Sequence, residues 1–250
     1  MQSKNLFILS ISAIWLLSMI GLLVNKTDAN QSSISSLPVN IQSIRESDNF
    51  FYIRAEYPQF QTAGTDFNQE IATLISGKID NFKKQSLDNW KARLDTIPTG
   101  KLIPENPEQP FTFIASWQSA QLNHTYLSLM IEIYYFSGGA HGNEEIHAFN
   151  YDMVKKKKIG INDFFGSPQE ALKKISDISA QDIMSQLQSR GWREDDTLRE
   201  MVSQGTAPVF ENFENFNFDP HNLIIYFQRY QVAPGAVGSL TVTISRQMLE

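Results

Sequence analysis

The chain has 250 residues, a hydrophobic fraction of 42% and a formal net charge of −6 at pH 7. This composition is typical of a globular chain with a buried core and excludes disorder over most of its length. The absence of cysteine excludes disulfides, thiolate metal sites and a catalytic thiol, and the negative charge argues against a nucleic-acid partner and favours a basic one.

An uncharged apolar run from Leu6 to Val24 follows Lys4. Such a run is either a signal peptide or a membrane anchor, and Thr27-Asp28-Ala29 offers an imperfect cleavage site. We therefore interpret residues 1–29 as a signal peptide or N-terminal membrane anchor and the Ser-rich residues 30–36 as a linker. Both alternatives place the rest of the chain outside the cytoplasm, in the periplasm or at the cell surface, with the signal either cleaved near Ala29 or kept as an anchor.

Residues 37–136 predict a β-β-α-β-β lobe. Strands are expected at 39–45 and 50–57, with Pro58 ending the second because proline cannot donate to a ladder. Asp66 is expected to cap a helix that continues to about Leu94. The apolar stripe of that helix has a helical period and consists of Phe67, Ile71, Leu74, Ile75, Ile79 and Phe82. A Pro-rich loop at 97–110 and a strand at 111–122 complete this part.

A strict alternation from Thr125 to Phe136 predicts a strand with one buried face. It leads into the Gly-rich turn Ser137-Gly138-Gly139-Ala140-His141-Gly142. Glycine permits positive φ and close backbone approach, so we expect this turn to display Ser137 and His141. Such a display suits binding.

Residues 137–250 predict a second lobe. A strand at 145–151, a Lys-rich turn at 154–159 and a helix from Pro168 to Gly191 are followed by a short helix at 194–204. Beyond a segment rich in Phe and Asn at 209–219, strands at 223–230 and 240–244 flank a Pro234-Gly235 turn. The predicted fold class is α+β, with two β/α lobes that each pack a long helix on a mostly antiparallel sheet.

Several motifs allow a chemical and a structural interpretation. His141, Glu144, Glu145 and His147 could form a metal or general-base cluster, but no helical H-E-x-x-H is present and we favour a turn-capping His141. Lysines 155–158 are interpreted as a solvated turn rather than as a basic patch. The phenylalanines at 210, 213, 216 and 218 are interpreted as core residues rather than as a sugar-stacking platform. Ser137 lacks a nucleophile elbow. No catalytic residue, metal or cofactor is predicted.

Five motifs in order resemble a known family. They are Tyr57-Pro58-Gln59, the turn from Tyr135 to Gly142, Asn150-Tyr151-Asp152, Ile161-Asn162-Asp163-Phe164-Phe165, and the segment from Ile225 to Gly238. Over residues 39–249 the chain is similar to the extracytoplasmic domain family of the lysozyme-sensing anti-sigma factor RsiV and of the N-terminal region of the peptidoglycan deacetylase PdaC. The resemblance implies a two-lobed α+β module that recognises a lysozyme or contacts the cell wall.

The chain departs from these relatives in three places. Only Met1 to Asn5 precede the apolar run and the chain ends at Glu250, so we expect neither sigma-factor control nor deacetylase activity. Gly235 stands where lysozyme-binding relatives are expected to carry an aromatic residue.

The sequence predicts a non-enzymatic extracytoplasmic binding module. Its partner would be a basic, lysozyme-like protein or a cell-wall component, and the alternatives are an envelope glycan hydrolase and a structural envelope interaction protein. The predicted partner-binding residues are Tyr135, Ser137, Gly138, Gly139, His141, Tyr230 and Pro234.

Overall fold

A computed structural model describes residues 37–165 and 167–249. The predicted signal or anchor at residues 1–29 and the predicted linker at residues 30–36 both lie outside these residues. Within the described ranges, no helix is both long enough and apolar enough to cross a lipid bilayer.

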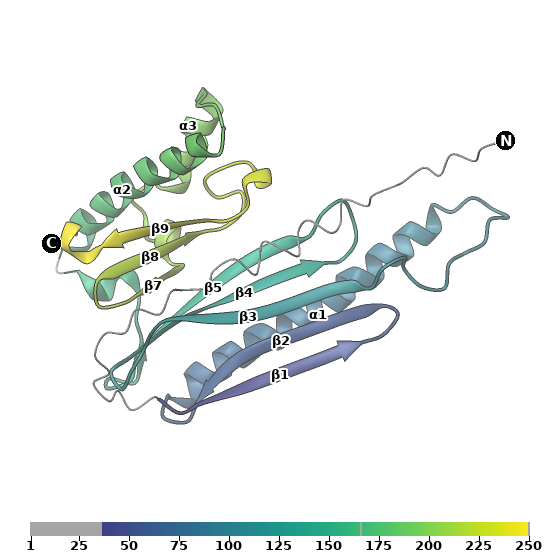
Figure 1. The fold of residues 1–250 in the computed structure, drawn as a ribbon, viewed down its shortest axis with the longest axis horizontal. Helices are drawn as coiled ribbons and strands as arrows, with labels where there is room; N and C mark the ends of the chain where they lie inside the picture. The colour runs from purple at the N-terminus through teal and green to yellow at the C-terminus, as the bar shows by residue number, and fades with distance from the viewer. Residues whose placement is uncertain (1–36, 166, 250) are drawn as a thin grey trace, which may run out of the picture. The chain divides into compact units, whose positions relative to one another are not determined.

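The first sheet has six strands in chain order (Figure 1). They are β1 (Val39–Ser47), β2 (Phe51–Phe60), β3 (Phe111–Leu122), β4 (Tyr126–Phe136), β5 (Asn143–Asp152) and β6 (Lys157–Lys158). Neighbours are antiparallel except β2 and β3, which are parallel because the helix α1 (Thr65–Asp95) crosses over between them. Since β5 pairs with β4 along almost its whole length, this sheet continues past residue 136, where the predicted first lobe ends.

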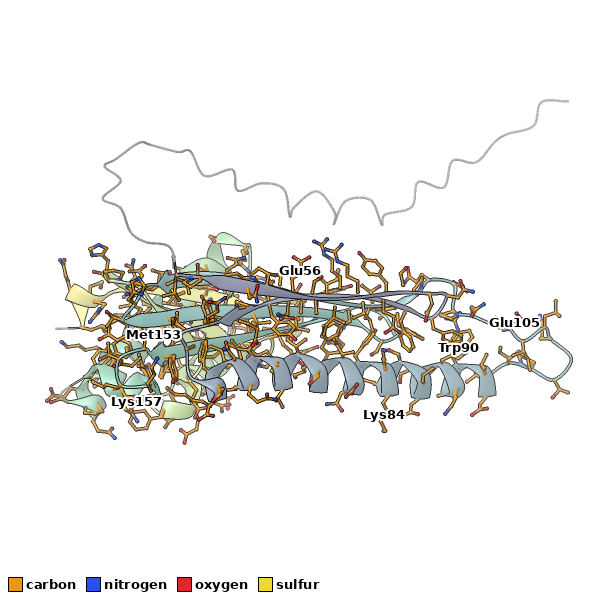
Figure 2. All side chains as sticks on the ribbon, turned by 90° about the horizontal axis from the view of Figure 1, so that it is seen from below. Glu56, Lys84, Trp90, Glu105, Met153 and Lys157 are labelled. Carbon is orange, nitrogen blue, oxygen red and sulfur yellow. The ribbon has the colours of Figure 1, made fainter. Side chains whose placement is uncertain are left out.

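The first core lies between α1 and one face of this sheet. Figure 2 shows α1 along that face, with Trp90 near the end of the helix and Glu105 in the loop beyond. The predicted stripe is confirmed, because Phe67, Ile71 and Ile75 are at most 1% exposed. Their counterparts on β4 alternate as predicted and are all 0% exposed: Leu127, Leu129, Ile131 and Ile133.

Two local predictions in this half were wrong. Strand β2 continues through Pro58 to Phe60 and pairs Pro58 with Ile41 of β1. The proline is tolerated because the β3 pairing ends at Ala55, so beyond that point β2 has a strand on one side only. Helix α1 begins one residue before Asp66, with Gly64 as its N-cap and Asp66 in the first turn.

The second sheet has three antiparallel strands, β7 (Phe216–Phe218), β8 (Asn222–Phe227) and β9 (Leu240–Ser245). Helix α2 (Pro168–Ser189) packs on it, followed by α3 (Asp196–Gly205) (Figure 1). Pro168 occupies the first turn of α2 as predicted. The core interpretation of the Phe-rich segment is confirmed for Phe213, Phe216 and Phe218, which are at most 2% exposed, although β7 itself was not predicted. The predicted α+β class is confirmed.

Side-chain amides join the second sheet to the outer edge of β5. The Asn215 side chain accepts a hydrogen bond from the Ala148 amide and donates one to the Ile146 carbonyl, both at 2.8 Å. The Gln228 side chain accepts from the Ile146 amide at 3.2 Å and donates to its carbonyl. Asn215 and Gln228 thus form hydrogen bonds with the edge of β5 as a neighbouring strand would. They pair the backbone groups of Ile146 and Ala148, which β6 does not reach.

A buried polar network crosses between the sheets. The Ser128 hydroxyl donates to Asn150 Oδ1 at 2.7 Å, and Asn150 Nδ2 donates to the Phe216 carbonyl at 2.7 Å. Asn217 Nδ2 donates to the Leu129 carbonyl at 2.9 Å. Ser128 and Asn217 are both 0% exposed. Because unpaired polar groups are costly in such surroundings, the network fixes how β7 sits on β4 and β5.

Candidate functional site

Arg229 joins the two turns that the sequence singled out. Its Nε donates to the Gly235 carbonyl at 2.6 Å, and one of its terminal nitrogens donates to the Gly142 carbonyl at 3.0 Å. The guanidinium also lies 5.4 Å from the centre of the Tyr230 ring. The Gly-rich turn and the Pro234 turn are therefore adjacent, and we call residues 135–145 with 228–238 the two-turn surface.

Glycines let tyrosine rings lie against both turns. Gly138 and Gly139 have φ values of 98° and 106°, as their conformational freedom predicts. A Cβ at Gly142 would lie 2.5 Å from the Tyr134 ring, and a Cβ at Gly235 would lie 2.1 Å from the Tyr230 ring. At Gly235, where relatives are expected to carry an aromatic residue, the structure thus places the ring of Tyr230.

The predicted site residues divide into surface and buried ones. Tyr230 is 60% exposed and His141 is exposed, with its Nδ1 3.0 Å from the Gly142 carbonyl oxygen, which fits the turn-capping interpretation. Tyr135 and Pro234 are half-buried. Ser137 is only 4% exposed, so the expectation that the turn displays it is wrong. Its carbonyl accepts from the Asn89 side chain of α1 at 2.8 Å, which draws this end of the turn inward.

The carboxylate of Glu145 is surrounded by donors. His147 Nε2 lies 2.9 Å away, and Lys78 of α1 forms an ion pair with it. The hydrogen bond from His147, together with Lys78, lowers the pKa of Glu145 to about 2, whereas burial and the nearby Glu145 charge raise the pKa of Tyr135. Glu145 is therefore a fixed anchor between β5 and α1.

The alternative interpretation of His141, Glu144, Glu145 and His147 as one cluster is not supported, because these side chains do not converge on one point. His141 turns to the Gly142 carbonyl, while His147 pairs with Glu145. Among residues 37–165 and 167–249, no three histidine, aspartate or glutamate side chains are placed to share a metal ion. The geometry gives this group a structural role.

The Glu145→Gln variant should lower the free energy of unfolding at pH 7 by on the order of 2 kcal/mol. The folded-state pKa of Glu145 is depressed from 4.5 to about 2, so its contribution is complete above pH 4.5 and is lost as the pH falls toward 2. Urea titrations of both proteins across this range should converge at the acid end. Glu144→Gln, on the exposed neighbouring residue, is the control and should change stability little. If the difference in free energy of unfolding between the wild type and Glu145→Gln stays the same down to pH 2, the depressed pKa of Glu145 is contradicted.

An open pocket of about 380 Å³ lies between the two turns. Its lining combines aromatic, amide and charged side chains, among them Tyr135, Asn143, Glu145, Gln228, Arg229 and Tyr230. Charges of both signs occur here, because Lys78 and Arg229 lie beside Glu144 and Glu145. Such a lining can hydrogen-bond a polar ligand or accept a protruding polar loop of a protein.

The lysines of the turn at 155–158 are bound by the chain itself. Lys157 pairs with Asp163 at 2.8 Å and Lys158 with Glu70 at 2.7 Å. Lys155 lies 3.7 Å from Asp152, and Lys156 donates to the Thr62 carbonyl at 2.6 Å. These internal contacts leave little free positive charge for an acidic polymer.

Sequence reasoning missed Arg229 and Gln228 as site residues. Both lie inside the quoted motif from Ile225 to Gly238, immediately after β8. Their place in that motif was the only signal, because their partners across the pocket, Ile146 and Gly142, lie 82 and 87 residues earlier in the chain.

Two family models match the chain in separate segments. Residues 44–144 match the family described as deacetylase PdaC, and residues 162–247 match DUF3298, described as a protein of unknown function. The chain is 27% identical over 198 residues to the peptidoglycan-N-acetylmuramic acid deacetylase PdaC of Bacillus subtilis strain 168. This alignment covers 73% of the chain and 41% of the relative, so the chain spans less than half of that protein. The resemblance to PdaC inferred from the motifs is confirmed.

Solved structures share the fold. A DUF3298 family member from Bacteroides fragilis NCTC 9343 superposes with a TM-score of 0.55 at 16% identity, covering 86% of this chain and 93% of that one. A DUF3298 family protein from Pseudomonas aeruginosa PAO1 gives a TM-score of 0.51 at 14% identity, with 86% and 94% covered. At these identities the likeness concerns the fold alone.

Proposed function

We propose that this chain, with its PdaC and DUF3298 segments, is a non-enzymatic extracytoplasmic module that binds a cell-wall-associated partner through the two-turn surface. The observation that carries the proposal is the contact of Arg229 with the carbonyls of Gly142 and Gly235, which holds both turns beside one open pocket lined by aromatic, amide and charged side chains. Loops held on a rigid sheet are a common form of binding site.

The state of Glu145 supports binding in preference to hydrolysis. A general acid or base needs a pKa near the working pH and an accessible proton. The pKa of Glu145 is about 2, and its carboxylate is occupied by Lys78 and His147. The two-turn surface thus offers hydrogen-bonding side chains around a carboxylate that Lys78 and His147 already occupy.

Two partner classes follow from different observations. The net charge of −6 supports a basic protein of the lysozyme type, because opposite charges speed encounter. The similarity to a relative whose name gives peptidoglycan as its substrate supports the cell wall itself. Calorimetric titration of the purified full-length protein with lysozyme, and sedimentation with insoluble peptidoglycan, would separate these classes. Binding to lysozyme should weaken as salt is added.

The Arg229→Ala variant should weaken binding to the partner by about tenfold or more. The substitution removes the donors to Gly142 and Gly235 and the cation next to Tyr230, so the two turns are no longer joined. Arg193→Ala, which removes an exposed arginine of the C-terminal half, is the matched control and should bind like the wild type.

Three results would overturn the proposal. The first is unchanged affinity of Arg229→Ala for a partner that the wild-type protein binds. The second is the absence of binding to both lysozyme and peptidoglycan at high micromolar protein. The third is release of soluble sugar fragments from peptidoglycan, which would show an enzyme.

A further inference from the structure

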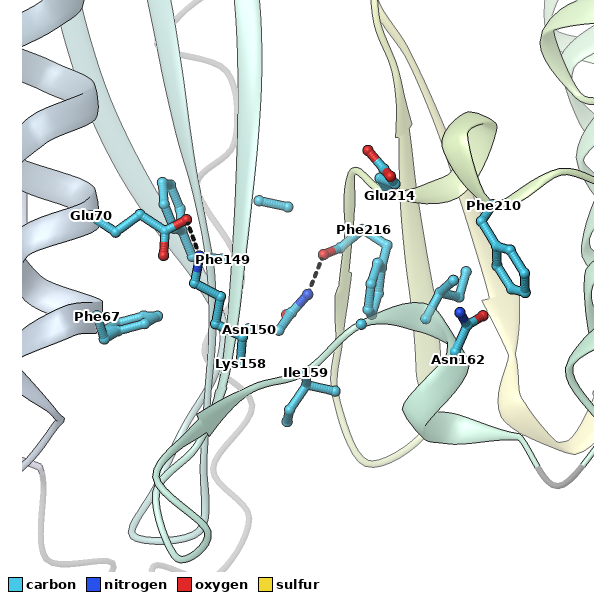
Figure 3. A pocket seen from close by; sticks show the side chains of 13 residues that line it. Phe67, Glu70, Phe149, Asn150, Lys158, Ile159, Asn162, Phe210, Glu214 and Phe216 are labelled. Atoms are coloured by element: carbon cyan, nitrogen blue, oxygen red, sulfur yellow. Dashed lines mark hydrogen bonds and ion pairs between the residues drawn. The ribbon is translucent and has the colours of Figure 1, made fainter.

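A second pocket lies between the two sheets, away from the two-turn surface. Figure 3 shows Phe67 and Glu70 of α1 on one side and Phe210, Glu214 and Phe216 on the other. The segment from Lys158 to Asn162 runs between these walls. The cavity measures about 230 Å³.

The walls of this intersheet pocket are aromatic, while its rim is polar. Phe216 is 1% exposed and packs edge-on against Phe164 at 5.8 Å, which fixes its ring. Phe210 is only half-buried, and it lines the cavity beside Asn162, whose amide is exposed. A ring and an amide at one opening offer an apolar face together with a hydrogen-bonding group.

The charges at the rim do not cancel. Lys158 forms an ion pair with Glu70 at 2.7 Å, so these two neutralise each other (Figure 3). Glu214 also lines the cavity, and within the described residues it makes no ion pair. The rim therefore carries one uncompensated negative charge beside aromatic rings, which suits a cationic group on a compact ligand.

The volume limits the size of that ligand. A cavity of about 230 Å³ corresponds to about eight water molecules at about 30 Å³ each. It is smaller than the pockets that hold drug-sized ligands, so one ring fits and a chain of rings does not.

We propose that the intersheet pocket binds a single amino sugar with a free ammonium group. The ammonium would pair with Glu214, the hydroxyls would bond Asn162 and the Glu70–Lys158 pair, and the C–H face of the ring would pack on Phe210. This site is independent of the two-turn surface and does not rest on the function proposed for it.

The test is an NMR titration of the full-length protein with glucosamine, N-acetylglucosamine and glucose. Glucosamine should shift the amide signals of residues 158–162, and the other two sugars, which lack the ammonium, should bind about tenfold more weakly or not at all. Glu214→Gln should weaken glucosamine binding about tenfold. Glu211→Gln removes an exposed carboxylate three residues away that does not line the cavity, and it should bind like the wild type.

The outcomes are decisive in both directions. Selective glucosamine binding that is lost in Glu214→Gln and kept in both Glu211→Gln and Arg229→Ala supports the site. No binding at millimolar sugar, equal binding of all three sugars, or equal losses in Glu214→Gln and Glu211→Gln would overturn it. A circular dichroism spectrum and a melting curve of each variant show that it is folded before it is titrated.

Discussion

The Asn217→Asp variant is expected to lose about 3–5 kcal/mol of stability at pH 7, the cost of leaving a charge buried without a partner. Asn217 is 0% exposed, and its amide nitrogen donates to the Leu129 carbonyl at 2.9 Å and to Asn150 Oδ1 at 3.1 Å. A carboxylate has the same shape but no donor, so one of its oxygens would face three acceptors, the Leu129 and Phe149 carbonyls and Asn150 Oδ1. The charge would also be buried between the two sheets.

The pH dependence separates this charge effect from a simple loss of fit. Burial among acceptors should raise the folded-state pKa of the new carboxyl above its unfolded value of about 3.9. Folding then favours the protonated form, so stability is regained below about pH 4 and is lost as the pH rises through the folded-state pKa.

The effect is measured by urea unfolding at pH 7 and below about pH 4. The proteins compared are the wild type, Asn217→Asp and the exposed control Asn40→Asp. A deficit of less than 1 kcal/mol at pH 7, or a deficit equal at both pH values, would show that the network does not hold the second sheet as described.

Patterns of apolar residues within short segments predicted most helices and strands, because such a pattern depends only on which face of the segment is buried. The stripe of α1 and the alternation of β4 each follow from which residues face one core, and a period of 3.6 or 2 records this in the sequence. The end of β2 was misjudged because the tolerance of Pro58 depends on where the β3 pairing stops, which lies more than 50 residues further along the chain. Short strands such as β7 leave too few residues for a period to be read.

The candidate site was predictable only in part. The glycines of both turns marked the right backbone, since a positive φ at Gly138 and Gly139 is a local property. The burial of Ser137 was not predictable, because it depends on Asn89, 48 residues earlier. Arg229 acts on a carbonyl 87 residues away, and the Asn217 network reaches over 88 residues. Contacts of this range leave no periodic trace in a single sequence.

Gly205 packs against the chain that leads into the Pro234 turn. It is the last residue of α3, it is buried, and its carbonyl accepts a hydrogen bond from the Gln231 side chain at 3.2 Å. A Cβ at this position would lie 2.1 Å from the Gln231 carbonyl oxygen and 2.7 Å from Val232 Cγ1. The nearest obstacle is backbone and cannot rotate away, so the chain between Arg229 and Pro234 would have to move.

The Gly205→Ala variant should therefore lose about 1–3 kcal/mol of stability, the usual cost of overpacking, and should bind the partner more weakly because Arg229 is displaced with the turn. Gly77→Ala is the matched control: Gly77 lies inside α1 with nothing within 4 Å of an added Cβ, so it should gain about 0.5–1 kcal/mol. Thermal melts and lysozyme or peptidoglycan binding of both variants measure these effects. If Gly205→Ala lowers the melting temperature and Gly77→Ala raises it, the loss of stability comes from the contact of α3 with the Pro234 turn. If both variants shift the melting temperature equally, the effect comes from helix propensity, and Gly205 does not support the two-turn surface.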